Sequence, residues 1–416
     1  MNFKQAVCLA LVASHMVYGR DDGTVRTPPM GWLSWSRYGC EIDCKRYPKA
    51  CINEQLYREQ ADRLSTDGYK ELGYSYVNID DCWSEMERDV DNRLVANKQR
   101  FPSGMKALAD YVHSKGLKLG IYGDVGPKTC AGYPGQNGKN DSGDYYTLDA
   151  KTFAEWGVDS LKFDGCNQDV KQFDHLYPQM GNALNTSGRP IVYICEWPPF
   201  QVASHVQTDY KAVTDSCHVF GSHSGDIQQS WESIASVLDY FGDNYDWMSK
   251  YHDMLVVGNY GLSHEQSRTQ FAMWAMFSAP LYMSNDLRDI STDDMKILQN
   301  KAIIGVNQDR NGVLAKRLVK VNSQQVWVKR VEPQVNGQWS YAVVYIDANP
   351  IGDKHYINLV NLEYILPDAK PTTEYVVHDL YMDEGKDVLG TLKSSDNLEL
   401  LVKTGGGCRM VKLVPK

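Results

Sequence analysis

Short apolar segments alternate with amphipathic segments from Met30 to about Gly312. The apolar segments are rich in β-branched and aromatic residues, which is typical of buried strands. They cover residues 30–35, 74–81, 117–125, 160–166, 190–197, 217–226, 254–259 and 281–287. Between most of them, as in 53–73 and 104–116, apolar residues recur at every third or fourth position, which predicts amphipathic helices.

Strands that alternate with helices usually pair in parallel, because each helix returns the chain to the start of the next strand. Eight such units over roughly 280 residues match a (β/α)8 barrel in number and in length. A doubly wound open sheet is the alternative, but no Gly-x-Gly-x-x-Gly motif follows any of the predicted strands. We therefore expect an α/β fold, with a TIM barrel over residues 20–312.

The pattern changes after Gly312. Segments in which apolar and polar residues alternate follow one another, separated by turns and without clear helices between them. They cover residues 324–331, 339–347, 355–362, 373–380, 398–402 and 409–414. Alternation of this kind predicts antiparallel strands with one buried face, and hence a C-terminal β-sandwich over residues 313–416.

Composition and charge narrow the class of ligand. The 416 residues carry a formal net charge of −9, and the sequence pI is about 5.6. Nucleic acid and anionic membranes both need a basic face, so we expect neither as a partner. The 26 Tyr and 10 Trp suit a neutral ligand such as a sugar. The longest apolar stretch after the N-terminus, 271–283, is too short to span a bilayer and contains Pro280.

The N-terminus has the features of a secretory signal peptide. Residues 1–19 combine one lysine, a short apolar run and a small residue at Gly19, where we expect cleavage. The glycosylation sequons at Asn140 and Asn185 agree with passage through the secretory pathway. The expected location is therefore lysosomal or extracellular.

Cysteine usage supports the same compartment. Nine cysteines remain when Cys8 of the signal peptide is left out. In an oxidising compartment this number predicts four disulfides and one free or intermolecular thiol, for which the isolated Cys408 is the candidate. A zinc site is the alternative, but no Cys-x-x-Cys pair and no nearby histidine cluster accompany the cysteines.

Ionisable and aromatic residues stand at the C-terminal ends of the predicted strands, which meet at one mouth of a barrel. They are Trp35, Asp80, Asp81, Tyr122, Asp124, Lys162, Asp164, Glu196, Trp197 and Asp226. One such carboxylate alone is more often a loop cap, but several that face one pocket must be held by hydrogen bonds or a cation. Lys162 and Asp164 are alternate residues of one strand and share a face, so we expect Lys162 to keep Asp164 ionised.

An ionised carboxylate, a second carboxyl group with a raised pKa, and aromatic walls are what glycoside hydrolysis needs. A metal-dependent hydrolase is the competing use of clustered aspartates. It would usually bring histidines at ligand spacing, and the predicted strand ends offer few. We therefore expect no metal and no organic cofactor.

Long motifs follow one another in order between about Thr27 and Asp309. They read "TPPMGWLSW", "NIDDCW", "HSKGLKLGIYGDVGPKTCAGYPG", "WGVDSLKFDGC", "CEWP" and "APLYMSNDLR". Together they closely resemble the α-galactosidase / α-N-acetylgalactosaminidase family, glycoside hydrolase family 27. The C-terminal region resembles the β-sandwich of this family more loosely. The resemblance implies a retaining exo-glycosidase that releases terminal α-linked galactose from glycolipids, glycoproteins or oligosaccharides, and often a homodimer.

The resemblance also implies roles for individual residues. Asp164 in "KFDGC" matches the nucleophile, and Asp226 in "GDIQQSW" matches the acid/base. Asp80 and Asp81 would accept hydrogen bonds from the 4- and 6-hydroxyls of galactose, and Trp35 would stack on the sugar. The remaining substrate-binding positions would be Tyr122, Cys130, Lys162, Glu196, Pro199, Phe200 and Met254. The disulfides of the family carry over as Cys40–Cys82, Cys44–Cys51, Cys130–Cys166 and Cys195–Cys217.

The two activities of the family differ at the 2-position of the sugar. Galactosidases place a glutamate and a bulky residue there, whereas N-acetylgalactosaminidases place serine and alanine to make room for the acetamido group. The segment "CEWPPF" presents Glu196 and Pro199, which favours galactose, chiefly through Glu196.

Two segments depart from the family pattern. Ser222 stands where the family has an arginine four positions before the acid/base. His218 and His223 are candidates to replace that arginine in part, although a structural role is more usual for a histidine. The loop around Tyr251 is shorter than in the family and keeps only Asp253 and Met254 of its motif. The alternative functions are an α-N-acetylgalactosaminidase or, because of these two departures, a secreted galactose-binding protein without turnover.

Overall fold

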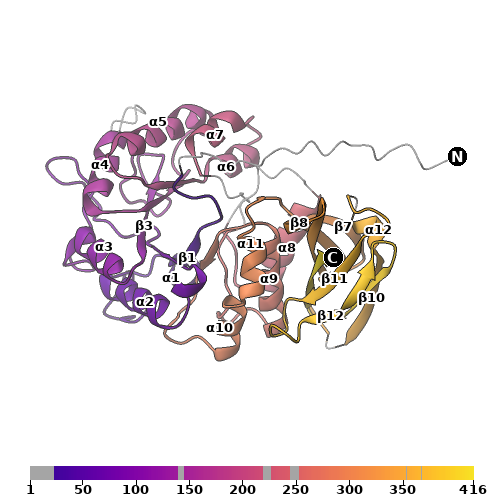
Figure 1. The fold of residues 1–416 in the computed structure, drawn as a ribbon. Coiled ribbons are helices and arrows are strands. Elements are labelled where there is room, and N and C mark those ends of the chain that lie inside the picture. The colour runs from indigo at the N-terminus through magenta and orange to yellow at the C-terminus, as the bar shows by residue number, and fades with distance from the viewer. Residues whose placement is uncertain (1–22, 139–144, 219–225, 244–252, 353, 367) are drawn as a thin grey trace.

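The computed structural model of the chain describes residues 23–138, 145–218, 226–243, 253–352, 354–366 and 368–416 (Figure 1). Several sequence-based expectations lie outside these residues. They concern the signal peptide at 1–19, the sequon at Asn140 and the altered positions Ser222, His223 and Tyr251. The other sequon residue, Asn185, is exposed in the last turn of a helix.

A curved parallel sheet forms the first half of the fold, with its strands in the order β5-β4-β3-β2-β1-β6. The strands are β1 (Met30–Leu33), β2 (Tyr76–Asn78), β3 (Lys118–Asp124), β4 (Ser160–Asp164), β5 (Val192–Cys195) and β6 (Leu281–Met283). Beyond β6 the sheet continues in a parallel bridge between Leu255 and Met283. Beyond β5 the N–H of His218 donates to the carbonyl of Tyr193. Both contacts extend the sheet toward the predicted strands 254–259 and 217–226, as a barrel requires.

Helices connect these strands and cover the outer face of the sheet (Figure 1). They are α1 (Trp35–Tyr38), α2 (Glu54–Thr66), α3 (Gly104–Ser114), α4 (Tyr146–Trp156), α5 (Phe173–Thr186), α6 (Trp197–Ala203), α7 (Tyr210–Ser216), α8 (Trp231–Asp243), α9 (His264–Met276), α10 (Thr292–Leu298) and α11 (Lys301–Asn307). The helix predicted over 53–73 ends early, at Thr66. Gly68 and Gly73 adopt φ of +88° and +104°, which an α-helix does not allow, and only a 3₁₀ turn lies between them.

Antiparallel strands form the second half of the fold. They are β7 (Lys316–Val321), β8 (Gln324–Val335), β9 (Gln338–Asp347), β10 (His355–Asn361), β11 (Glu374–Asp379), β12 (Val388–Lys393), β13 (Asn397–Lys403) and β14 (Cys408–Pro415), with the short helix α12 (Leu362–Ile365) after β10. One sheet has the order β12-β11-β14-β9-β8-β7, and the other pairs β10 with β13. Apolar side chains from both sheets share one core, so the predicted sandwich is confirmed.

The sequence pattern missed β7 and β12. Both are edge strands of the larger sheet, and most of their residues are exposed or half-buried, so their side chains do not alternate between a buried and an exposed face. The predicted domain boundary at 312/313 falls in the connection between α11 and β7 and stays a prediction. Within the part of the chain that the structure describes, no helix combines the length and the apolar character needed to cross a bilayer.

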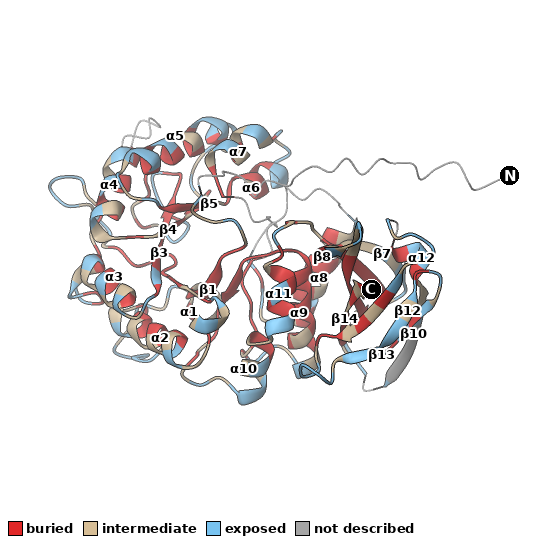
Figure 2. Ribbon diagram, viewed as in Figure 1, coloured by how far each residue is buried: buried red, intermediate tan, exposed pale blue. Residues whose placement is uncertain are grey.

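Helix α9 joins the two halves of the molecule. It lies between the parallel sheet and the C-terminal strands, and every residue from 269 to 276 is buried (Figure 2). A helix that is buried all round needs no polar face, which explains its weak amphipathic pattern. The C-terminal sandwich contributes the buried Lys329 of β8 to the contact with α9. Its Nζ donates hydrogen bonds to the carbonyls of Ala275 and Val306 and to Ser278 Oγ. These bonds tie the sandwich to α9 and α11.

Four disulfides are present, and they are the pairs that the family resemblance implies. They are Cys40–Cys82, Cys44–Cys51, Cys130–Cys166 and Cys195–Cys217. Among the described residues Cys408 is a free thiol, buried in β14 with its sulfur 3.2 Å from Tyr381 Oη.

Candidate active site

The strand ends bring most of the predicted site residues together. Tyr122 and Asp164 lie near the ends of the adjacent strands β3 and β4, and Tyr122 Oη donates to Asp164 Oδ2 at 2.9 Å. Asp164 Oδ1 accepts the N–H of Gly165 at 2.8 Å. Burial raises the pKa of Asp164, while the nearby Lys162 acts to lower it. Both of its oxygens are therefore oriented by hydrogen-bond donors.

Lys162 lies near Asp164 but forms its ion pair with Asp80. Its Nζ donates to Asp80 Oδ2 at 3.0 Å. Burial acts to lower the pKa of Lys162, but the charges of Asp80, Glu196 and Asp164 outweigh it and raise this pKa well above its usual value. The expectation that Lys162 shares the pocket with Asp164 holds. The ion pair forms with Asp80, because Asp80 follows the facing strand β2 and offers the nearer oxygen.

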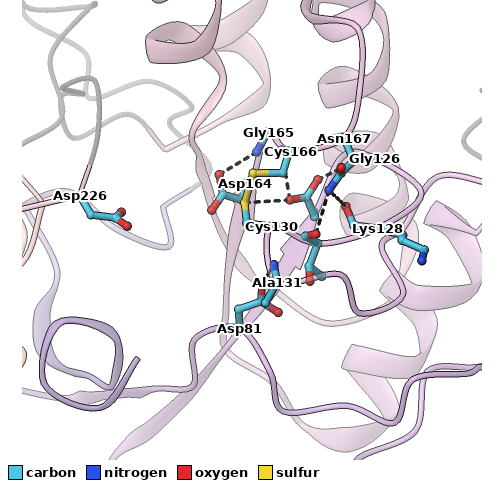
Figure 3. The surroundings of a disulfide bond; sticks show 12 residues. Asp81, Gly126, Lys128, Cys130, Ala131, Asp164, Gly165, Cys166, Asn167 and Asp226 are labelled. Carbon is cyan, nitrogen blue, oxygen red and sulfur yellow. Dashed lines mark hydrogen bonds between the residues drawn. A yellow bond between two sulfur atoms is a disulfide. The ribbon is translucent and has the colours of Figure 1, made fainter. Parts of the chain in front are cut away.

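Asp80 and Asp81 form a pair of acceptors after β2. Asp80 Oδ1 accepts the N–H of Asp81, and Asp81 Oδ1 accepts the N–H of Cys82 at 2.6 Å. Asp81 Oδ2 accepts the N–H of Ala131 at 2.9 Å, a contact that Figure 3 shows beside the Cys130–Cys166 disulfide. Burial raises the pKa of Asp81 to about 6. The loop that carries Cys130 thus holds Asp81 in a fixed orientation.

Asp124 was predicted as a carboxylate that faces the pocket, but in the structure it binds main-chain groups of the neighbouring loops. Its side chain is fully buried, Oδ1 accepts the N–H of Gly126 and Oδ2 accepts the N–H of Cys166. Burial and the charge of Asp164 raise its pKa well above the usual range. Asp124 and Asp164 lie close to Cys130 and Cys166, but these cysteines form a disulfide and offer no thiolate to a metal ion. The donor set therefore does not fit a metal.

Trp197 also departs from its prediction as a pocket residue. Its indole N–H lies within hydrogen-bonding distance of Asp174 Oδ1 and Gln201 Oε1, and its ring stacks on Tyr177 with centroids 5.3 Å apart. Trp197 opens helix α6, and its fully buried ring packs between α6 and α5 rather than at the barrel mouth.

Glu196 is the buried carboxylate with an unused acceptor. It is 6% exposed, and its Oε1 has no hydrogen-bond partner among the described residues. Burial raises the pKa of Glu196 well above its usual value, Lys162 acts against this rise, and the charge of Asp164 adds to it. A buried acceptor without a partner is costly unless a ligand supplies the donor.

Helix α6 carries two further predicted residues, of which Phe200 lies beside the nucleophile. Pro199 is buried, and the ring of Phe200 lies against Gly165, where an added Cβ would come within 2.7 Å of the ring. Glycine is therefore required after Asp164 for Phe200 to reach the site. Met254 is buried as well, with its sulfur 3.3 Å from the N–H of Ser36 in α1.

Asp226 reaches the site from the opposite side of Asp164. Figure 3 shows its carboxyl group turned toward the region of Asp164 and the disulfide. Trp35 Nε1 donates to Asp226 Oδ2 at 3.0 Å. The indole predicted to stack on the sugar therefore also orients this carboxylate. Asp226 itself is exposed, unlike the other carboxylates.

Asp253 belongs to the site but does not stand at the end of a predicted strand. It lies within the field of Lys162 and Asp226, and burial raises its pKa to about 7 although Lys162 acts to lower it. It stands just before the segment 254–259, where the rule of converging strand ends does not reach. The signal for it in the sequence is that this segment keeps Asp253 from the family motif.

His218 has a structural role and does not face the pocket. Its Nδ1 accepts the N–H of Tyr193 at 3.1 Å, and its Nε2 lies 2.8 Å from Thr24 Oγ1. The ring is fully buried between β5 and the N-terminal segment. It therefore does not take the place of the missing arginine.

We expect the unfolding temperature to be several degrees lower near pH 7.5 than near pH 4.5. Burial raises the pKa values of Asp81 and Asp253 to about 6 and about 7, above their values in an unfolded chain. Between the pKa of an aspartate in the unfolded chain, about 4, and its raised pKa in the folded protein, the folded protein binds more protons than the unfolded one. The free energy of unfolding therefore falls as the pH rises through this range, by an amount on the order of a few kcal/mol. Calorimetric scans at both pH values test this. An equal or higher unfolding temperature at the higher pH would contradict it.

Comparison with known proteins gives a consistent result. A family model described as alpha galactosidase A matches residues 27–309. The chain is 43% identical over 395 residues to alpha-N-acetylgalactosaminidase from Gallus gallus, which covers 93% of each chain. It is 45% identical over 361 residues to human alpha-galactosidase A, which covers 83% of this chain and 80% of the other. The crystal structure of alpha-galactosidase I from Mortierella vinacea superposes with a TM-score of 0.75 at 29% identity, over 94% of this chain and 98% of that one.

Proposed function

The chain belongs to glycoside hydrolase family 27, the family of α-galactosidases and α-N-acetylgalactosaminidases, and from that premise we propose that it releases terminal α-linked galactose with Asp164 as nucleophile and Asp226 as acid/base. One observation carries the assignment of these roles. Asp164 is oriented by Tyr122 and Gly165, and Asp226, oriented by Trp35, is turned toward it from the opposite side (Figure 3).

In the first step the protonated Asp226 gives its proton to the glycosidic oxygen. The bond between this oxygen and the anomeric carbon breaks, and an oxygen of Asp164 forms a bond to the same carbon on the opposite face of the ring. In the second step Asp226 takes a proton from water, the water oxygen attacks the anomeric carbon, and Asp164 leaves as a carboxylate. Two displacements on the same carbon retain the α-configuration.

The charges of the pocket favour this sequence. Lys162 stabilises negative charge on Asp164 and Asp80, which helps Asp164 to leave in the second step. The oxocarbenium character of the transition state is stabilised by the surrounding carboxylates, which burial keeps away from water. Asp80 and Asp81 retain acceptor capacity toward sugar hydroxyls, and Trp35 offers an aromatic face to the C–H groups of the ring.

Galactose is the substrate that Glu196 supports. The free Oε1 of this buried side chain can accept a hydrogen bond from the 2-hydroxyl, which satisfies an acceptor that is otherwise unpaired. The buried Pro199 leaves less room than alanine would for an acetamido group. α-N-Acetylgalactosamine is the second candidate, because the chain matches the Gallus gallus enzyme of that name over 93% of both lengths.

The discriminating experiment compares kcat/KM for p-nitrophenyl α-galactoside and p-nitrophenyl α-N-acetylgalactosaminide. We expect a preference for the galactoside of about 10²-fold or more, and a reversal in the double variant Glu196→Ser/Pro199→Ala, which removes the carboxylate and adds space. Val202→Ala, on the exposed side of α6, is the matched control and should leave the ratio unchanged. A wild-type preference for the acetamido sugar would favour the second candidate instead.

The proposal extends to location and assembly. Four disulfides and the exposed Asn185 support passage through the secretory pathway, to the lysosome or the cell exterior. A homodimer is supported by the family resemblance. Sedimentation of the purified chain would measure its assembly.

A further inference from the structure

Asp253 is a buried carboxylate to which the mechanism above gives no task. Its side chain is 6% exposed, and each of its oxygens accepts a main-chain N–H. Oδ2 accepts from Ile227 at 2.6 Å, and Oδ1 accepts from Met254 at 2.8 Å. Ile227 directly follows Asp226 in the chain. One side chain thus fixes the main chain next to the acid/base.

Asp253 is itself held rigidly. Its φ of +46° lies in the left-handed region, which residues with a side chain seldom adopt and which the surroundings must therefore enforce. Its carbonyl accepts the indole N–H of Trp274 at 2.9 Å. Trp274 belongs to α9 and is fully buried, so the position of Asp253 is set by the helix that joins the two halves of the molecule.

We propose that Asp253 is a positioning residue for the acid/base, which fixes the main chain beside Asp226. The inference rests on the proposed function, since that function gives Asp226 its role.

The surroundings of Asp253 set the pH at which its charge appears. Lys162 on β4 attracts it, Glu196 after β5 and Asp226 repel it, and burial acts against ionisation. Burial raises its pKa to about 7, so Asp253 is mostly neutral in acid and becomes charged near neutral pH. An assay in acid therefore reports the positioning role without the charge of Asp253.

The test is kcat/KM at acidic pH for Asp253→Asn, with methyl α-galactoside and 2,4-dinitrophenyl α-galactoside as substrates. The side-chain NH₂ group of asparagine cannot accept one of the two N–H bonds, so the main chain beside Asp226 loses one of its two contacts with this side chain. Activity should fall by about tenfold or more with the methyl glycoside, whose leaving group needs the acid, and much less with the dinitrophenyl glycoside, whose leaving group does not.

Asp309→Asn is the matched control. Asp309 is 7% exposed, its Oδ1 accepts the N–H of Asn311 and its Oδ2 accepts the N–H of Glu332, but it lies at the start of the connection between α11 and β7. It should lower stability and leave the leaving-group dependence unchanged. A leaving-group dependence of Asp253→Asn that matches that of Asp309→Asn would overturn the positioning role alone. A wild-type protein that cleaves neither galactosides nor N-acetylgalactosaminides would overturn the proposed function and this inference together.

Discussion

Asp164→Ala is expected to lower kcat/KM for α-galactosides by roughly 10⁵-fold, the scale on which a covalent nucleophile contributes. The residue has no substitute in the pocket. Asp124, on the adjacent strand, uses both of its oxygens on the N–H groups of Gly126 and Cys166 and is fully buried. Asp80 is paired with Lys162. Neither carboxylate can move to the anomeric carbon without breaking these bonds.

Added azide distinguishes the loss of a nucleophile from the loss of the fold. In Asp164→Ala the space left by the carboxylate can admit a small anion, which attacks the anomeric carbon from the face that Asp164 used. With an α-galactoside that has a good leaving group, the expected product is therefore β-galactosyl azide, identified by the coupling constant of its anomeric proton. An unfolding temperature close to that of the wild type serves as the control. Residual turnover near the wild-type level would refute the assignment of Asp164.

The repeating parts of the fold could be predicted from the sequence. Strand ladders lie within the predicted segments 30–35, 74–81, 117–125, 160–166, 190–197 and 281–287. In such a strand nearly every residue is buried, so composition alone identifies it. Edge strands lack this property, and β7 and β12 were missed for that reason. The early end of α2 depends on two backbone conformations at glycine, which hydrophobic periodicity does not report.

Most residues of the candidate site could be predicted from the sequence, but the contacts between their side chains could be predicted less well. The rule that strand ends converge found Asp80, Asp164 and Glu196, since it needs only the order of strands. It does not reveal the ion pair between Lys162 and Asp80, because that contact depends on which oxygen lies nearer across two strands. It also included Trp197, whose ring turns into the α5–α6 contact as soon as helix α6 begins. Side-chain direction at a strand-to-helix junction is set by tertiary packing.

The site combines a rigid half and an exposed half. On the side of the nucleophile, the Cys130–Cys166 disulfide, Asp124 and Asp81 connect the loops after β2, β3 and β4 through buried hydrogen bonds. On the side of the acid/base, Asp226 is exposed and is held by Trp35 and, through Ile227, by Asp253. A nucleophile must stay at a fixed distance from one carbon, whereas an acid/base must serve first a leaving group and then water. The two halves suit these two tasks.

The kcat/KM of Asp226→Ala should depend strongly on the leaving group, and this dependence would reveal the division of tasks. Without a proton donor, kcat/KM for methyl α-galactoside is expected to fall by about 10³-fold, within the range for general acids. For 2,4-dinitrophenyl α-galactoside the first step needs little help, so Asp164 should still form the glycosyl-enzyme, and a fast initial release of dinitrophenol should precede slow hydrolysis. Trp35→Phe keeps the aromatic face but removes the N–H donated to Asp226, and should show a weaker form of the same pattern.

With azide, Asp226→Ala is expected to form a galactosyl azide whose anomeric configuration is opposite to that of the product formed by Asp164→Ala. In Asp226→Ala the intermediate is still bonded to Asp164, which shields one face of the sugar, so azide must enter from the other face and yield α-galactosyl azide. Azide needs no general base, and the slow second step should therefore accelerate as its concentration increases. The pair of products assigns the two carboxylates independently of any loss in rate. If Asp226→Ala gave the β-azide, or lost activity equally with both leaving groups, Asp226 would not be the acid/base, and its hydrogen bond from Trp35 would serve only to hold the loop.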